Sequence, residues 1–272
     1  VHLNLKQLLK KIISYITYRF GYRFVSKKLV DHSDDPFIVI AGLLSNIGVQ
    51  TVVDGGASIG DITIKLSKLF KDAQIYAFEP YLPFVKIFKD KTKDFSNIHL
   101  EPFALDETEG TRRLNINNSE GTNSILNANL SENQPFGSLM EKSDEVEISC
   151  KTLEKWSKNN NSPTIDLIKL DLQGNELAAL KGAFSLFNHN NVKCILCEVS
   201  FIAQYEKQPL ASEVIDFLAR HSFDLFNFYQ VHFHHGQIIQ ADALFIHKSI
   251  SQDVLQASKH LFHPHSQYLK LS

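Results

Sequence analysis

Short apolar runs alternate with segments of helical period along most of this chain. The apolar runs end at glycine, proline or acidic residues, and the helical segments carry apolar side chains three or four positions apart. This alternation predicts a parallel β-sheet with right-handed helical crossovers. The strands are expected at 51–53, 74–78, 98–102, 166–170 and 192–199, and the helices at 37–44, 62–69, 81–91, 152–159, 177–184 and 212–221.

Two regions depart from this alternation. The runs 224–233 and 237–247 flank His234-His235-Gly236, which predicts a β-hairpin that closes the sheet with one antiparallel strand. The expected fold class is therefore α/β, with a mostly parallel sheet and helices on both faces. Residues 103–145 are the least regular, with short strands expected at 112–116 and 146–150. The polar segment 117–124 between them is either a lid that faces the substrate or a plain surface loop.

The first 35 residues form a separate region. Leu5, Leu9, Ile12 and Ile16 mark one face of a helix, and the first 30 residues contain several basic residues and no acid. Such a basic amphipathic helix either contacts an anionic membrane peripherally or packs on the main domain with a solvated basic face. The main domain is expected at 36–250, and residues 251–272 at the C-terminus form a weakly patterned tail.

The first candidate site follows the strand at 51–53. The stretch Thr51-Val52-Val53-Asp54-Gly55-Gly56-Ala57-Ser58-Ile59-Gly60 reads as a buried strand and a tight turn before a helix. Gly56, Ala57 and Ser58 would let the backbone approach a ligand, and the helix would direct its unpaired N–H groups toward it. The strict G-x-G-x-x-G dinucleotide pattern is absent. A glycine-bearing turn without a ligand remains the alternative at this point.

Further acids stand at the predicted ends of other strands. Glu79 follows the strand at 74–78, where nucleotide-binding folds place a carboxylate on the ribose hydroxyls. Asp171 follows the strand at 166–170 and precedes a glycine turn, and Glu198 lies near the end of the strand at 192–199. These acids are expected to meet along one edge of the sheet.

Composition narrows the class of protein. The formal net charge of -2 gives no overall field that would attract nucleic acid. No apolar stretch reaches the ~18 residues of a membrane span. The three cysteines predict a reducing, cytoplasmic compartment rather than a disulfide framework. Cys194 and Cys197 are expected on opposite faces of one strand, and no metal is predicted, although His232 and His234 could share a face.

The chain resembles the FkbM-type methyltransferases over roughly residues 45–248. The matching stretches are Val52 to Gly60, Ala77-Phe78-Glu79-Pro80, Ile168 to Leu177 with Leu180-Lys181-Gly182, and Asp242-Ala243-Leu244-Phe245. The resemblance implies S-adenosyl-L-methionine as cofactor and the Rossmann-like class I methyltransferase fold, with a seven-stranded sheet. It also implies a hydroxyl acceptor, often on a sugar, glycan or glycosylated natural product.

The resemblance also implies roles for single residues. Asp54, Gly56, Ala57 and Gly60, with Ser58 between them, would line the methionine and ribose part of the cofactor. Glu79 would bind the ribose hydroxyls, Ala104 would lie near the adenine, and Asp171 beside the amino group or the reacting centre. Asp171 and Glu198 are our candidates for the general base. Two rival functions are a non-catalytic adenosyl-binding module and a nicotinamide-dependent oxidoreductase.

Overall fold

The computed structural model describes residues 35–130, 137–161, 163–188 and 191–261. The basic N-terminal helix expected within residues 1–35 lies outside the described residues, apart from Asp35. In the described part of the chain, no helix has both the length and the apolar character needed to cross a bilayer.

Within the described residues, seven strands form one sheet in the order β3-β2-β1-β7-β8-β10-β9. The first five of these pair in parallel, and β10 runs antiparallel to both of its neighbours. The expected α/β fold with one antiparallel strand in a C-terminal hairpin is confirmed. The strands of this sheet are β1 (Thr51–Gly55), β2 (Gln74–Phe78), β3 (Ile98–Glu101), β7 (Ile165–Leu170), β8 (Val192–Ser200), β9 (Phe223–His234) and β10 (Gln237–His247).

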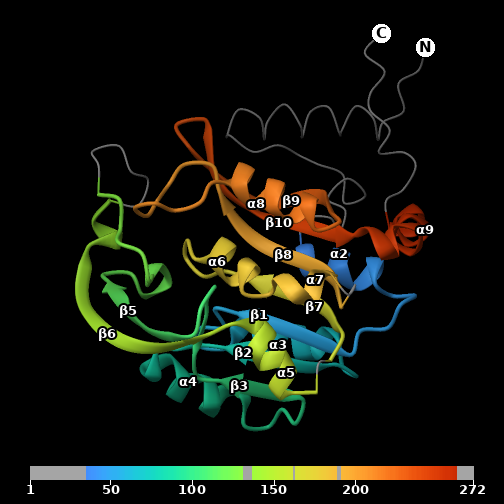
Figure 1. Cartoon of the computed structure of the whole chain (residues 1–272), viewed down its shortest axis with the longest axis horizontal. Coiled ribbons are helices and arrows are strands. Elements are labelled where there is room, and N and C mark those ends of the chain that lie inside the picture. Colours follow the sequence, from blue (N-terminus) through green and yellow to red (C-terminus); the bar gives the residue numbers. More distant parts are fainter. Residues whose placement is uncertain (1–34, 131–136, 162, 189–190, 262–272) are drawn as a thin grey trace, which may run out of the picture.

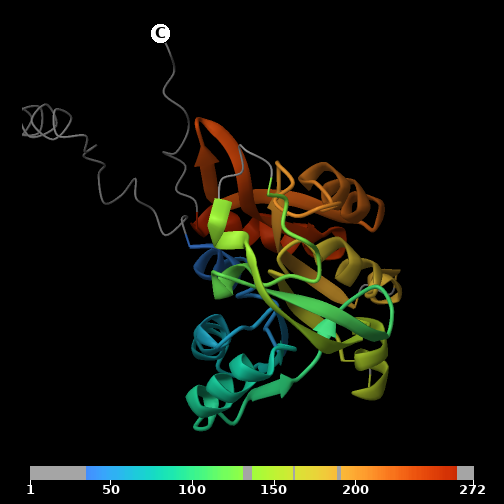
Figure 2. The same ribbon diagram turned by 90° about the vertical axis from the view of Figure 1, so that its left-hand side faces the viewer.

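Helices cover both faces of this sheet (Figures 1 and 2). One apolar core joins the sheet to α5 (Leu153–Asn159), α6 (Glu176–Lys181), α7 (Phe184–Asn188) and α8 (Ala211–Arg220). On the other face lie α2 (Pro36–Leu43), α3 (Asp61–Leu69), α4 (Leu82–Thr92) and α9 (Ser251–Leu261). Successive residues of a strand enter opposite cores, as Val52 and Val53 do. Cys194 and Cys197 are likewise buried on opposite faces, as predicted.

A second, smaller sheet lies to the left of the main sheet in Figure 1. It contains β4 (Ala104–Leu105), β6 (Lys142–Lys151) and β5 (Gly110–Asn117), in that order. Both long strands extend beyond the ranges predicted from the sequence, and β4 was not predicted. Two residues carry too little pattern to signal a strand, and β4 forms because it pairs with Cys150 and Lys151 of β6.

Two helical expectations were wrong. The helix expected at 177–184 ends at Lys181, and Phe184 begins α7 with 48% of its surface exposed instead of joining the apolar face. The residues from 251 on were expected to form a weakly patterned tail, but they begin with α9. Val254 of α9 belongs to the core that also contains α2, and Ala257 is buried as well, so tertiary packing stabilises a helix whose sequence signal is weak.

The order of the strands creates a switch point between β1 and β7. From β1 the chain moves outward through β2 to β3, and after the small sheet it returns to the opposite side of β1. In such sheets ligands bind beyond the carboxyl ends of the strands at this point.

The amino end of β7 is held by a different contact. There the buried side chain of Asp166 accepts hydrogen bonds from the backbone N–H groups of Gln50 (2.6 Å) and Thr51 (2.9 Å).

Candidate active site

The loop after β1 passes extremely close to the loop after β7. Gly56 has φ +74°, and a Cβ on it would lie 1.9 Å from the carbonyl oxygen of Asp171. Only glycine fits there, for steric and conformational reasons together. The N–H groups of Gly56 and Ala57 both donate to the Phe78 carbonyl at 3.1 Å, which ties the same loop to β2. The carboxyl ends of β1, β2 and β7 are thereby held together around the Gly56 loop.

Asp54 lies beneath this loop rather than in a cavity. Its side chain is fully buried, accepts a hydrogen bond from the Thr63 hydroxyl at 2.6 Å and lies 3.4 Å from the Lys169 ammonium. Lys169 is 3.8 Å from Asp171 and also donates to the Gly56 carbonyl at 3.4 Å. Burial alone would lower the pKa of Lys169, but Asp54 and Asp171 raise it above its usual value, so the ammonium stays charged.

Glu79 holds the end of β2 through its carboxylate. One oxygen accepts from the Ser58 N–H at 2.9 Å and the other from the Tyr81 N–H at 2.8 Å. The side chain is 6% exposed, and burial raises its pKa to about 7, against the opposing effect of these two hydrogen bonds. A carboxyl group that titrates near neutral pH in a cavity is typical of a functional site.

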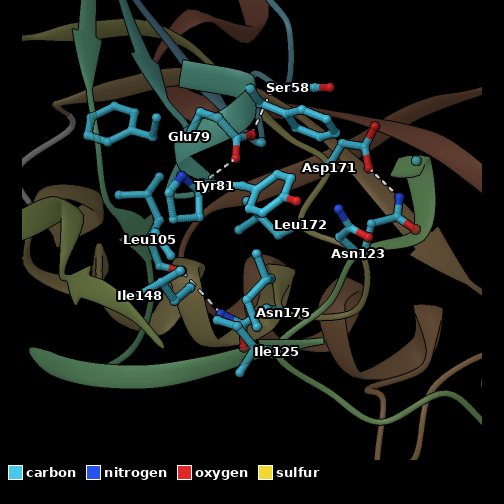
Figure 3. A pocket seen from close by; sticks show the side chains of 18 of the residues that line it. Ser58, Glu79, Tyr81, Leu105, Asn123, Ile125, Ile148, Asp171, Leu172 and Asn175 are labelled. Atoms are coloured by element: carbon cyan, nitrogen blue, oxygen red, sulfur yellow. Dashed lines mark hydrogen bonds between the residues drawn. The ribbon is translucent and has the colours of Figure 1, made fainter. Parts of the chain in front are cut away.

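A cavity of about 260 Å³ opens at the switch point beside Glu79 (Figure 3). One side of it is polar, with Ser58, Glu79 and Asp171. The opposite wall is apolar and comes from the smaller sheet and its approach, including Ala104, Leu105, Leu114 and Ile148. Glu120, Gly121 and Asn123 of the polar segment at 117–124 also line the cavity, together with Ile125 just after it.

The loop after β7 is organised by its own side chains. Gln173 and Gly174 both have positive φ, and the Glu176 carboxylate accepts from the N–H groups of Leu172 (2.6 Å) and Gly174 (3.2 Å). The Gln173 amide donates to Asp171 at 2.7 Å and accepts from the hydroxyl of buried Tyr205 at 2.8 Å. Asp171 is therefore held in place by a side chain two residues away, which is anchored in turn on Tyr205.

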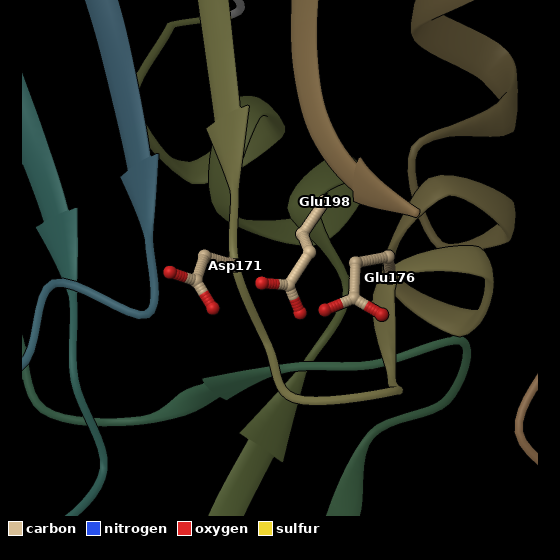
Figure 4. A group of neighbouring side chains, drawn as sticks. All are labelled: Asp171, Glu176 and Glu198. Carbon is tan, nitrogen blue, oxygen red and sulfur yellow. The ribbon is translucent and has the colours of Figure 1, made fainter. Parts of the chain in front are cut away.

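Three carboxylates gather at the ends of β7 and β8 (Figure 4). Asp171, Glu176 and Glu198 place one oxygen each within 4.8 Å of one another. Burial and the neighbouring negative charges raise the pKa of Glu176 to about 7 and that of Glu198 well above its usual value. The group has the ligand atoms for a hard cation, yet Glu176 and Glu198 also accept hydrogen bonds from the protein. In the described residues, His232 and His234 belong to no such group.

The predicted site residues separate into three places. The main cavity is lined by Gly56, Ser58, Glu79, Ala104 and Asp171. Asp54, Ala57 and Gly60 support this cavity from outside its lining. Ala57 packs with Ala77 and Phe88, and a Cβ on Gly60 would lie 2.9 Å from Phe88. Glu198 lines a second, smaller cavity together with Asp171.

Sequence reasoning missed several residues of the site. Lys169 could have been noticed, because a lysine inside an apolar strand signals a buried charge pair. Asp242 was part of a matching stretch but received no role, although it lines the second cavity. The apolar wall from β5 and β6 carries no local signal, because strand pairing far along the sequence brings it to the site.

Comparison with known families agrees with this geometry. The model of the methyltransferase FkbM domain matches residues 54–225, which run from the end of β1 into β9. The chain belongs to the FkbM methyltransferase family. The resemblance found in the sequence is therefore confirmed. The matched region contains the loops after β1 and β7, both of which line the main cavity, and it also contains the smaller sheet.

The individual proteins to which the chain is similar are distant. Methyltransferase 1 of Beauveria bassiana (strain ARSEF 2860) is 25% identical over 142 residues, which cover 48% of this chain and 57% of that protein. Magnesium protoporphyrin IX methyltransferase from Synechocystis PCC 6803, solved with bound SAM, gives a TM-score of 0.45 at 12% identity, covering 91% of this chain and 99% of that one. An rRNA methylase from Streptococcus thermophilus gives the same two values over 78% and 96%.

Glu79 should make the stability of this FkbM-family protein depend on pH. Because folding raises its pKa from 4.5 to about 7, the folded state binds the proton more tightly than the unfolded chain. Its contribution is complete below pH 4.5 and falls by up to about 3 kcal/mol as the pH rises through 7. When the pH rises from 5 to 8, the free energy of unfolding measured in urea should therefore fall less for Glu79→Gln than for the wild type. Parallel pH profiles for the two proteins would contradict this role.

Proposed function

We propose that the protein is an S-adenosylmethionine-dependent methyltransferase that binds its cofactor in the cavity at the β1–β7 switch point. The observation that carries this proposal is the Glu79 carboxylate, which ends β2 at the edge of that cavity beside the glycine-bearing loop. A carboxylate in this position suits the two hydroxyls of a ribose. Membership of the FkbM family supports the same reading.

The cavity divides naturally between the parts of such a cofactor. Glu79 would accept hydrogen bonds from the ribose, and the apolar wall that includes Ala104, Leu105 and Ile148 would cover the adenine. The methionine part would follow the loop at Gly56 and Ser58 toward Asp171. A carboxylate there attracts both the amino group and the sulfonium. Asp54 would act indirectly, by neutralising Lys169 below the loop.

The proposed acceptor is a hydroxyl group on a sugar, a glycan or a glycosylated natural product. When bound, the cofactor supplies an activated methyl group, and much of the rate then depends on positioning the acceptor oxygen. The hydroxyl must also lose its proton. Asp171 is fixed by the Gln173 amide at 2.7 Å, and Glu198 lies beside it in a group whose crowding favours uptake of a proton. These two carboxylates are our candidates for the base.

Substitution of Glu79 tests the cofactor site. Glu79→Ala removes the proposed acceptor of the ribose hydroxyls, and we expect the affinity for S-adenosylhomocysteine to fall about 10- to 100-fold. Isothermal titration calorimetry measures this directly. Glu107→Ala is the matched control, because this acid is exposed, pairs with Lys181 and does not line the cavity. Equal affinity in wild type and both variants would argue against the assigned ribose site.

Substitution of the two candidate bases tests the chemical step. Asp171→Asn and Glu198→Gln keep the side-chain volume but remove the carboxylate, so transfer of a tritiated methyl group to a hydroxyl acceptor should fall about 100-fold or more. Glu198 does not line the cofactor cavity, and Glu198→Gln should therefore bind S-adenosylhomocysteine as the wild type does. Full turnover in both variants would remove these residues from the base role.

A further inference from the structure

A second cavity of about 130 Å³ lies beside Asp171, which also lines the proposed cofactor cavity. Asp171 lines both cavities, and it is the one residue that their linings share within the described chain. The second cavity is built at the ends of β7 and β8 and against the β9–β10 hairpin, with Phe37 and Ile62 forming an apolar side. Anything bound there would therefore lie next to a residue that also lines the proposed cofactor cavity.

The lining of this second cavity combines acids with amides. Glu198 and Asp242 are direct cross-strand partners on β8 and β10, an arrangement of like charges that normally destabilises a sheet. The Gln240 amide donates to Glu198 at 3.1 Å, and Gln230 and His232 reach the cavity from β9. Burial, together with the charge of Asp171, raises the pKa of Asp242 to about 6. A partly buried pair of like charges such as Glu198 and Asp242 is typical of a binding or catalytic site, where function outweighs its cost to stability.

Positive charge in the cavity is limited. Lys169 is the cation that lines it, and its ammonium is already shared between Asp54, Asp171 and the Gly56 carbonyl. The charged and titratable groups around the cavity are Lys169 and Asp171 at β7, Glu198 on β8, His232 on β9 and Asp242 on β10, with Glu176 of α6 against Asp171 and Glu198. The carboxylates exceed the ammonium, so an anionic ligand would be repelled.

We propose that this second cavity is the acceptor site and that it takes a neutral, polyhydroxylated group while excluding anionic ones such as uronates and phosphate esters. The inference rests on the proposed methyltransferase function and adds the place and the charge class of its acceptor. Carboxylate and amide side chains accept and donate hydrogen bonds to hydroxyls, and the apolar side suits the C–H face of a sugar. Asp171 and Glu198 then face the hydroxyl that is to be methylated.

Introduced cysteines test the location without a known acceptor. A thiol placed by Glu198→Cys or Gln240→Cys would itself accept the methyl group when the protein is incubated with S-adenosylmethionine. The new S–CH₃ bond forms as the bond from carbon to the sulfonium breaks, the thiol proton passes to a neighbouring carboxylate, and S-adenosylhomocysteine is released. Peptide mass spectrometry should find one added methyl on the introduced thiol in at least one variant.

Three comparisons make this result specific. Ile238→Cys places a thiol on the same hairpin but outside both cavities, and it should remain unmethylated. The native Cys194 and Cys197 should also stay unmodified, because burial raises the pKa of both thiols. Calorimetry with S-adenosylmethionine on each variant separates the two proposals. Binding without thiol methylation in either variant overturns the location, whereas absence of binding in the wild type overturns the proposed function itself.

The charge class is tested by two alkylating reagents of similar size. Neutral iodoacetamide and anionic iodoacetate both form a C–S bond with loss of iodide. For the Gln240→Cys thiol, we expect the rate ratio of iodoacetamide to iodoacetate to exceed that of the exposed Ile238→Cys thiol about tenfold. Equal ratios, or a preference for iodoacetate, would overturn the exclusion of anions. A thiol that neither reagent reaches would overturn the cavity as a binding site.

Discussion

The buried ion pair between Asp54 and Lys169 underlies the whole site. Lys169 lies on β7 and Asp54 on β1, so their 3.4 Å contact joins the two strands that flank the switch point. Above the pair, the Asp171 N–H donates to the Gly55 carbonyl at 3.2 Å, and Gly56 passes where no side chain would fit. Removing one partner of such a pair typically costs about 3–5 kcal/mol, because the other charge stays buried and unpaired. Asp54 therefore supports the backbone around the cavity from below, whereas Gly56, Ser58, Glu79 and Asp171 line the cavity itself.

Negative charge along the carboxyl edge of the sheet is the other constraint. Glu79, Asp171, Glu176, Glu198 and Asp242 come from different elements, yet the parallel strands bring their ends together. Glu79 and Glu176 are buried and the other three acids are partly buried, and the pKa values of Glu79, Glu176, Glu198 and Asp242 are all raised. The arrangement weakens the folded state near neutral pH, because a carboxyl group whose pKa is raised by folding destabilises the folded state when it ionises. A bound sulfonium and a bound ammonium would relieve the same repulsion, which links the unfavourable charge to the proposed cofactor.

The sequence specified the main sheet well because its signals are local. The apolar run at 74–78 coincides with β2, and Thr152 caps α5 through a 3.0 Å bond from the Lys155 N–H as its residue type suggests. Strand-end acids were also predictable, because parallel strands place their carboxyl ends along one edge. Helix α9 and strand β4 were missed, since both depend on partners distant in sequence. The second cavity could not be predicted from the sequence for the same reason. Its lining combines residues of α2 and α3 with residues of β9 and β10, which lie far along the chain.

The proposed function requires the cavity at the switch point to recognise an adenosyl sulfonium or thioether rather than a dinucleotide. Isothermal titration of the wild-type protein with S-adenosylmethionine, S-adenosylhomocysteine and NAD in turn tests this claim most directly. We expect saturable one-to-one binding of both adenosyl ligands and no measurable heat with NAD, because the loop lacks the glycine pattern of a pyrophosphate site. Binding of NAD alone would point to an oxidoreductase on a similar sheet. Absence of binding by all three ligands would contradict the account and leave the fold without the proposed chemistry.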